Sequence, residues 1–458
     1  MKSSNLSVLT GMLFIWASLY SVQAVSASGE AGHHHMKKAS KPKNGAKSEA
    51  RAQFQKGESC NKPSVKCAKT VTSAFAPNGD LWRLWVHKGP TQGQRMYFQI
   101  SQDDGKHFGD IKHVDIAPEP ISARNENRPK IAFDQPASGE PNVYLSWASS
   151  LGKRFTSNVR FTWSTDYGKH FNEAVTVNDD GLITGHSFNE MLVDGQGNVT
   201  LVWLDSRHRY LAKQEGREEI GSSLYLGTAN PVSSASSTTD FSKSFAFENS
   251  QLANRTCVCC RIATDVNQQG NPVVLWRHIY GDHIREFALM TLGEDKEPIQ
   301  ISHDEWRIEG CPHQGGGVSV DTDNNYHLVW FNQGKKGQGI FYSFSTDKGH
   351  TLSKPLSVGN KQAGAAHAHV MSNQVEMNGK AIDKTIDIVD IVWTEFNGEQ
   401  YQLWHQSSLT NGDGFNAPKI IATSTADSDR PFLLKKGQQT FVSWQRPKQG
   451  HFFHALDR

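Results

Sequence analysis

The residues of this chain best suited to chemistry are cysteines and histidines gathered in short clusters. Three clusters stand out in the sequence: Cys257-Val258-Cys259-Cys260, Cys311-Pro312-His313 and His367-Ala368-His369. Thiolate and imidazole groups are the ligands that soft or borderline ions such as copper(I) and zinc prefer. The candidate metal ligands are His186, Cys257, Cys259, Cys260, Cys311, His313, His367 and His369. The sequence therefore predicts a soft-metal site, copper before zinc, if the fold brings these residues together.

Disulfide bonding is the alternative use of the same thiols. The chain has six cysteines, an even number that suits an exported protein held by disulfides. Cys60 and Cys67 are close enough in the sequence to pair. The four clustered cysteines could form two further bridges or serve in thiol chemistry, so the sequence leaves these uses open beside metal binding.

A repeated tryptophan indicates the elements that must position these clusters. It ends a short apolar run in each repeat, at Trp85, Trp147, Trp203, Trp276, Trp330, Trp393 and Trp444. The interval is roughly 60 residues, and a fixed period of this kind is typical of solenoids and propellers. Each run is too short for an ordinary helix, and polar turns and further short strands surround it. Four antiparallel strands per repeat predict an all-β fold, a β-propeller.

A sharper turn pattern follows the third strand of three repeats. The copies are Ser101-x-Asp103-x-Gly105-x-x-Phe108, Ser164-x-Asp166-x-Gly168-x-x-Phe171 and Ser345-x-Asp347-x-Gly349-x-x-Leu352. The Ser and Asp side chains can accept bonds from backbone amides, and the glycine permits a positive φ. This pattern resembles the Asp box, or bacterial neuraminidase repeat, of the sialidase superfamily. The resemblance implies a propeller whose Asp boxes lie away from its active site.

The number of repeats departs from the family pattern. Sialidases resemble six-bladed propellers, whereas seven repeats can be counted here, so we favour seven blades and keep six as the alternative. The last repeat shows only three strands before the chain ends. We expect residues 64–69 to supply its outer strand and close the ring, with the propeller spanning residues 60–458.

Propeller topology predicts where the chemical residues lie. Loops before inner strands and after second strands meet at one mouth of the central channel. The clustered cysteines and histidines precede inner strands, as do Arg128, Arg261 and Arg430, and Asp205 follows a second strand. We therefore expect all of them on one rim.

The family resemblance also implies a second function, glycoside cleavage of the sialidase type. Sialidases hold the substrate carboxylate with three arginines, whose guanidinium groups suit bidentate binding. The candidate catalytic residues are Arg128, Arg261, Arg430 and, as acid, Asp205. The family's Arg-Ile-Pro motif is not found at the first inner strand, residues 72–75, and arginines at these positions can equally bind loop carbonyls. A glycan- or protein-binding module without catalysis is the third reading.

The remaining sequence limits the partners and the location. A net charge of +2 and the lack of basic, aromatic-rich runs argue against nucleic-acid binding. Residues 1–27 read as a cleaved signal peptide, with an uncleaved anchor as the alternative, and residues 28–59 as a flexible polar leader. We expect a periplasmic or secreted monomer, without a transmembrane segment when mature, that binds a metal ion, an anionic small molecule or a glycan.

Overall fold

The computed structural model describes residues 60, 62–88, 94–124, 126–136, 139–233, 243–378 and 383–457. The predicted signal peptide and leader, residues 1–27 and 28–59, lie outside the described residues. Within the described part, β-strands dominate the secondary structure. No helix in those segments has the length and apolar character that crossing a membrane requires.

The first two repeats form separate four-stranded antiparallel sheets, each paired in chain order. The first sheet contains β1 (Val71–Phe75), β2 (Leu81–Lys88), β3 (Gln94–Ser101) and β4 (Lys112–His113). The second contains β5 (Lys130–Phe133), β6 (Val143–Ser150), β7 (Ser157–Ser164) and β8 (Val175–Thr176). In each, a short inner strand and two long strands precede a short outer strand.

The next two repeats are joined in one eight-stranded sheet. Its first half contains β9 (His186–Val193), β10 (Val199–Asp205), β11 (Ser222–Ala229) and β14 (Glu248–Thr256). Its second half contains β15 (Ala263–Val266), β16 (Pro272–Tyr280), β17 (Ile284–Thr291) and β18 (Ile299–Gln300). The halves meet where Thr256 pairs with His278. Between β10 and β11 the chain forms α1 (Arg207–Gln214), and β12 (Val232–Ser233) pairs with β13 (Lys243–Ser244).

Two further four-stranded sheets and one three-stranded sheet complete the described chain. They contain β19 (Gly317–Val320), β20 (Tyr326–Gly334), β21 (Gly337–Ser345) and β22 (Leu356–Val358); β23 (Ala366–Asn378), β24 (Asp383–Phe396), β25 (Tyr401–Ser408) and β26 (Lys419–Ser424); and β27 (Phe432–Lys436), β28 (Gln439–Arg446) and β29 (Gly450–Ala455). A short 3₁₀ turn, Lys361–Ala363, precedes β23.

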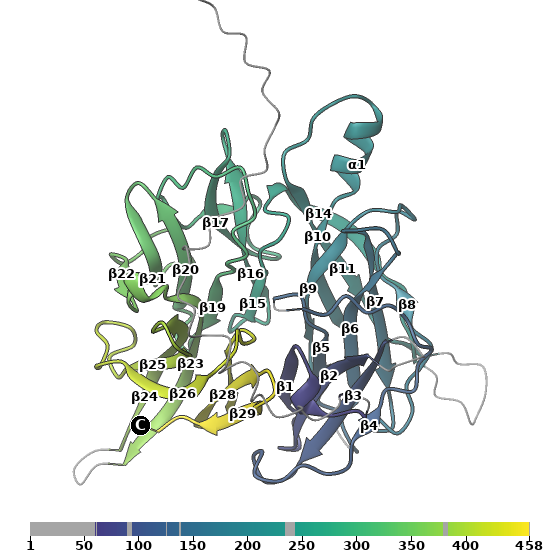
Figure 1. The fold of residues 1–458 in the computed structure, drawn as a ribbon, viewed down its shortest axis with the longest axis horizontal. Helices are drawn as coiled ribbons and strands as arrows, with labels where there is room; N and C mark the ends of the chain where they lie inside the picture. Colours follow the sequence, from purple (N-terminus) through teal and green to yellow (C-terminus); the bar gives the residue numbers. More distant parts are fainter. Residues whose placement is uncertain are drawn as a thin grey trace, which may run out of the picture. The chain divides into compact units, whose positions relative to one another are not determined.

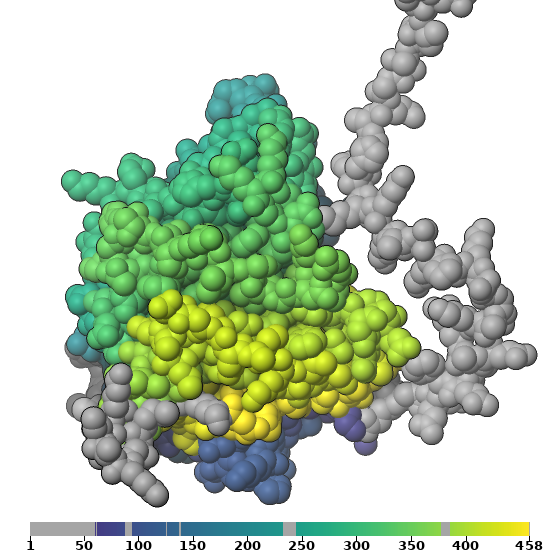
Figure 2. Space-filling view, turned by 90° about the vertical axis from the view of Figure 1, so that its left-hand side faces the viewer, coloured from purple at the N-terminus to yellow at the C-terminus, as the bar shows by residue number. Residues whose placement is uncertain are grey.

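The inner strands contact one another in a closed cycle. The order is β1, β5, β9, β15, β19, β23, β27 and again β1. In Figure 1 the labels of β1, β5, β9, β15 and β19 surround the middle of the fold, whereas β4, β8 and β22 lie at its periphery. Figure 2 shows one side of the molecule, where bands of teal, green and yellow succeed one another as the sheets follow in chain order. The predicted all-β propeller is confirmed, and its blade number stays a prediction because two repeats share one sheet.

The repeated tryptophans form the cores between consecutive sheets. Trp147 packs with Trp82, Leu84 and Phe98 of the preceding sheet, and Trp203 packs with Phe161 in the same way. Both indoles are fully buried. Burying an aromatic side chain of about 150–250 Å² contributes roughly 4–6 kcal/mol. The repeat is therefore visible in the sequence because each junction between sheets needs one large apolar side chain.

All three predicted Asp boxes form the expected turn. In the first, the Ser101 hydroxyl lies 2.8 Å from Asp103 Oδ1 and accepts the Gly105 amide at 2.9 Å. A fourth turn, which the sequence reading missed, follows β25: Ser408 Oγ accepts the Gly412 amide at 2.9 Å and lies 3.3 Å from Thr410 Oγ1. Gly412 has φ +87°, a conformation that glycine adopts without strain. The sequence pattern did not reveal this copy because it has Thr410 where the other three copies have aspartate.

The expectation that residues 64–69 supply the outer strand of the last sheet is wrong. Residues 65–67 form a 3₁₀ turn, and the Cys67 and Ala68 amides bond to the Ser64 and Val65 carbonyls, 3.0 and 3.1 Å away. Because these amides are used locally, the segment cannot add a strand to the last sheet. It lies against that sheet through Gln445, whose amide donates to the Val65 carbonyl at 2.8 Å. The predicted Cys60–Cys67 disulfide is present.

Candidate metal centre

Two neighbouring loops carry the cysteine clusters. Residues 257–262 connect β14 to β15, and residues 301–316 connect β18 to β19. The loops are brought together because the inner strands that follow them, β15 and β19, contact each other. The Cys257 amide donates to the Arg277 carbonyl at 2.9 Å, which holds the start of the first loop against β16. Cys259 and Cys311, which are far apart in the sequence, therefore lie close together because the strands that follow them are neighbours in the ring.

Three of the thiols form a compact buried group. Cys257, Cys259 and Cys260 are 1%, 6% and 2% exposed. Cys257 Sγ lies 3.8 Å from Cys259 Sγ and 3.5 Å from Cys260 Sγ. None of the three forms a disulfide, and neither does the exposed Cys311. The two additional bridges that the sequence allowed are therefore not formed in this structure.

A second group shares one member with the first. The ligand atoms of Cys257, Cys259 and Cys260 all lie within 4.8 Å of one another, and so do those of Cys259, Cys311 and His313. Cys311 and His313 are exposed, whereas Cys259 is buried. The cluster therefore extends from the interior to the surface, with Cys259 in the middle.

Glycines allow the second loop to approach the first. A Cβ atom added to Gly315 would lie 2.9 Å from Arg261 Cβ, and one added to Gly316 would lie 2.7 Å from the Phe287 ring. Both separations are shorter than side-chain carbons tolerate. The absence of a side chain at Gly315 lets residues 311–316 pack against the cysteine loop at Arg261, and Gly316 lets the same segment pack against β17.

The thiols differ in their electrostatics. Hydrogen bonds from Cys259 and Cys260, aided by Arg285 and Arg277, hold the pKa of Cys257 well below its usual range. Burial raises the pKa of Cys260 to about 12. A hydrogen bond from Cys259 lowers the pKa of Cys311 to about 7. The group thus stabilises at least one thiolate in a buried position.

Two buried arginines next to these thiols have only neutral partners. The Arg277 guanidinium donates to the carbonyls of Gln314 and Phe331 and to Asn332 Oδ1. Arg285 Nε donates to the Ile308 carbonyl, while Arg285 Nη1 and Arg277 Nε are buried without a hydrogen-bond partner. Among the described residues, neither guanidinium forms an ion pair with a carboxylate. Their charge favours thiolates in the cluster.

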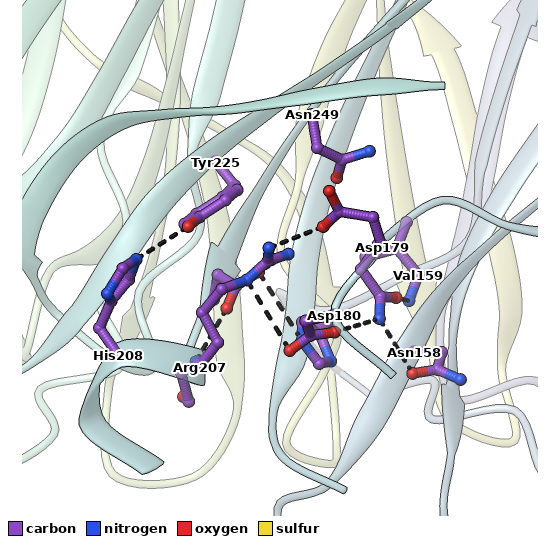
Figure 3. A network of polar contacts seen from close by, with 12 residues as sticks. Asn158, Val159, Asp179, Asp180, Arg207, His208, Tyr225 and Asn249 are labelled. Carbon is purple, nitrogen blue, oxygen red and sulfur yellow. Dashed lines mark hydrogen bonds and ion pairs between the residues drawn. The ribbon is translucent and has the colours of Figure 1, made fainter. Parts of the chain in front are cut away.

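His186 lies apart from the cysteines, in a network with carboxylates. Its Nδ1 is 2.7 Å from the Ser157 carbonyl oxygen, and its Nε2 is 3.0 Å from Asp180 Oδ2 and 3.7 Å from Asp205 Oδ2. Figure 3 shows Arg207 pointing from α1 toward Asp179 and Asp180 in this network. Both imidazole nitrogens already face oxygen atoms, so the expectation that His186 joins the thiols is corrected.

Asp205 also belongs to this network and not to the arginine cluster. It is fully buried, and its Oδ2 accepts bonds from Trp203 Nε1 at 2.9 Å and Arg207 Nε at 3.1 Å. Its Oδ1 accepts the Arg207 amide at 2.9 Å. Asp205 is therefore closed to solvent and lies apart from Arg128, Arg261 and Arg430 in this structure, and its role as catalytic acid stays a prediction.

His367, another predicted ligand, lies beside a buried carboxylate, Glu126, which was not among the candidate residues. Glu126 accepts the amides of Gly315 at 3.1 Å and Arg261 at 3.3 Å. His367 Nδ1 and Arg430 Nε lie 3.7 and 4.0 Å from its Oε1. Burial lowers the pKa of His367 to about 4. His369, also buried, has a pKa lowered to about 3. The signal in the sequence that could have identified Glu126 is its position shortly before the inner strand β5.

Two of the three predicted arginines are bound by protein oxygens. Arg261 Nη2 donates to the Gly316 and Ala368 carbonyls at 2.8 and 2.9 Å. Arg128 donates to the Val71 carbonyl and to Asp429 Oδ1, both at 3.0 Å. Arg430 differs, because it lines a cavity of about 80 Å³ together with His367, Glu395, Tyr401 and Asp427. The three arginines do not present a free carboxylate clamp.

Comparisons with known proteins bear on the fold. No family model matches the chain, and no curated protein matches it either. Among solved structures it is similar to the BP39L lectin from Burkholderia pseudomallei, with a TM-score of 0.52 and 11% identity over 85% of this chain and 96% of the lectin. A Penicillium chrysogenum α-L-arabinanase complexed with arabinobiose (TM-score 0.45, 10% identity, 88% and 96% covered) and the Hadza microbial sialidase Hz136 (0.43, 12%, 80% and 74%) are also similar. The likeness to the lectin agrees with the β-propeller fold described above, and at this identity it shows the fold alone.

Proposed function

We propose that this protein binds a soft metal ion, copper(I) before zinc, through its cysteine cluster. The ligands are Cys257, Cys259 and Cys260, with Cys311 and His313 at the surface. The observation that carries the proposal is the 3.5 and 3.8 Å spacing of three buried thiol sulfurs. Sulfurs bound to one tetrahedral ion at about 2.3 Å lie about 3.8 Å apart. The thiols are thus already spaced as ligands.

The surrounding charge supports copper(I) over zinc. Three thiolates and one copper(I) ion carry two negative charges, which the buried cations Arg277 and Arg285 offset. A zinc(II) ion on the same three inner thiolates leaves an excess of positive charge in a buried region, which is costly. Thiolate ligands suit copper(I) and zinc alike, so the charge is the argument for copper(I).

The proposed setting is outside the cytoplasm, in the periplasm or the medium, with the protein acting as a monomer. The support is the N-terminal sequence, in which Lys2 and an apolar stretch precede small residues suited to cleavage. An oxidising compartment is also where the Cys60–Cys67 disulfide forms. In such a compartment, four nearby thiols need a ligand to stay reduced, and a bound metal ion is that ligand.

The test is the metal content and thiol count of the exported protein purified without chelator or reductant. We expect bound copper or zinc at one ion per chain or more, with Cys60–Cys67 as the only disulfide. His313→Ala should lower retention of the ion, and His303→Ala, which changes an exposed histidine of the same connection, should not. A metal-free protein whose four clustered cysteines are oxidised would refute metal binding.

A second candidate function is recognition of an anionic group or a sugar in the cavity beside Arg430. Tyr401, Asp427 and Arg430 line it with donors and acceptors, and one structure similar in fold is a lectin. Its volume of about 80 Å³ is below the roughly 300 Å³ of ordinary ligand pockets, so it suits one substituent. Arg430→Gln should abolish binding measured by calorimetry against mono- and disaccharides. Turnover of a fluorogenic sialoside, lost in the same variant, would instead establish sialidase-type hydrolysis.

A further inference from the structure

Cys259 occupies a position that no other ligand in the cluster shares. Its sulfur belongs to both groups of close ligand atoms, one with Cys257 and Cys260 and the other with Cys311 and His313. We propose that the cluster holds two soft metal ions bridged by the Cys259 thiolate, an inner ion on Cys257 and Cys260 and an outer ion on Cys311 and His313. This inference rests on the proposed metal-binding function and concerns the number of ions.

The distances favour two ions over one. Ligand atoms around a single ion with bonds of about 2.0–2.3 Å lie roughly 3.3–4 Å apart. Cys257, Cys259 and Cys260 meet this condition, since Cys257 Sγ lies 3.5 Å from Cys260 Sγ and 3.8 Å from Cys259 Sγ. No group of the described ligand atoms within 4.8 Å of one another combines Cys311 or His313 with Cys257 or Cys260. One ion therefore cannot be bound by both sets unless the loops move.

The burial of the ligands gives the two positions different properties. Cys257 and Cys260 are 1% and 2% exposed, so an ion held by them is shielded from water and from competing ligands. Cys311 and His313 are exposed, so the outer ion is open to exchange with a chelator. The inner ion is accordingly the slow one and the outer ion the fast one.

The charge in and around the cluster is consistent with two copper(I) ions. Four thiolates and two copper(I) ions together carry two negative charges. Arg277 and Arg285, which have no carboxylate partner among the described residues, supply two positive charges. Neutrality matters here because most of the group is buried. With Cys259 shared, the four sulfurs and one imidazole give each ion three ligands.

The decisive measurement is a titration of the reduced, metal-free full-length protein with copper(I), delivered from a bathocuproine complex and read by native mass spectrometry. We expect two copper ions per chain, the first at lower free copper(I) than the second. A single ion that requires all four cysteines would overturn the dinuclear proposal and leave the proposed function intact. No bound copper or zinc at all would overturn both.

Variants on the exposed loop test the assignment of ligands with little risk to folding. The double variant Cys311→Ser/His313→Ala should retain one slowly exchanging copper ion and lose the fast one. His303→Ala, the matched control, should retain both. If the double variant instead loses all copper while its circular dichroism stays native, the two positions are not independent and the proposal fails.

X-ray absorption of the copper-loaded protein provides a second readout. A metal–metal scattering contribution should be present in the wild type and missing in Cys311→Ser/His313→Ala. Its absence from a wild-type sample carrying two copper ions would show that Cys259 does not bridge them, which contradicts the proposal.

Discussion

The cysteine cluster and the site around Glu126 are built from the same parts of the propeller but end in opposite states. Both consist of residues in the loops before inner strands or at the first positions of those strands. At the first site the Glu126 carboxylate faces Arg430 and offsets its charge, although Arg430 Nε and His367 Nδ1 are buried without a hydrogen-bond partner. In the cysteine cluster the three buried thiols contact one another, and the nearby Arg285 has an unpaired buried nitrogen. The Glu126 site contributes to the stability of the fold, whereas the cysteine cluster leaves thiols available as ligands for the proposed metal ions.

The largest effect should come from removing the charge of Glu126. Glu126→Gln leaves Arg261 and Arg430 buried without their shared carboxylate, and breaking a buried pair in this way costs about 3–5 kcal/mol. Urea denaturation should show this loss in the free energy of unfolding. Copper(I) binding by the folded variant should be unchanged. An equal loss of copper affinity would mean that the two regions act as one site.

The same carboxylate should make stability depend on pH. Burial opposes its ionisation, but the adjacent His367 and the charges of Arg261 and Arg430 prevail and lower the pKa of Glu126 from 4.5 to about 2. A lowered pKa stabilises the fold fully above about pH 4.5, and this contribution disappears as the pH falls toward 2. The loss is roughly 3 kcal/mol. Denaturation at a series of pH values checks it, and Glu126→Gln should flatten the slope; an unchanged slope would assign it to another group.

Removing one inner thiol should weaken metal binding strongly. Cys260→Ser takes away a buried ligand, and because loss of groups that only support ligands already costs 10–100-fold, we expect a decrease of about 100-fold or more. Competition with bathocuproine measures the change. Cys67→Ser with Cys60→Ser, which removes the disulfide thiols, is the matched control and should leave copper affinity unaltered.

A smaller effect is expected from the unpaired arginine. Arg285→Gln removes positive charge beside the thiols and should weaken copper(I) binding by about 10-fold. Since Arg285 has no ion pair to lose among the described residues, its replacement should cost less stability than Glu126→Gln. A larger destabilisation than that of Glu126→Gln would reverse the contrast drawn between the two regions.

The smallest effect concerns a turn remote from both sites. Thr410→Asp restores the acidic residue of the fourth Asp box, whose turn already has Ser408 and Gly412 in place. One added bond to a backbone amide should stabilise the protein by about 0.5–1.5 kcal/mol. Thermal unfolding measures the gain, and copper binding should not respond. Destabilisation would show that the Thr410 hydroxyl bond to the Asp413 carbonyl matters more.

Most of the architecture could be predicted because it follows from local patterns. The tryptophan repeat and the Asp boxes report on strands and turns that are formed by neighbouring residues. The closure was mispredicted because residues 64–69 look extended in sequence, whereas a 3₁₀ turn next to the Cys60–Cys67 bridge uses their amides locally. The sequence of a short segment does not show whether its amides will bond within a turn or to a neighbouring strand.

The sequence by itself determined that the chain is a β-propeller and which residues lie at the starts of its inner strands. Only the tertiary structure decided which of those residues meet. Cys311 and His313 join Cys259 because β15 and β19 are neighbours and Gly315 lets their loops touch. His186 also lies at the start of an inner strand, as the first residue of β9, yet it faces Asp180. The groups that a side chain meets depend on the conformation of the neighbouring loops and not on its position in the repeat.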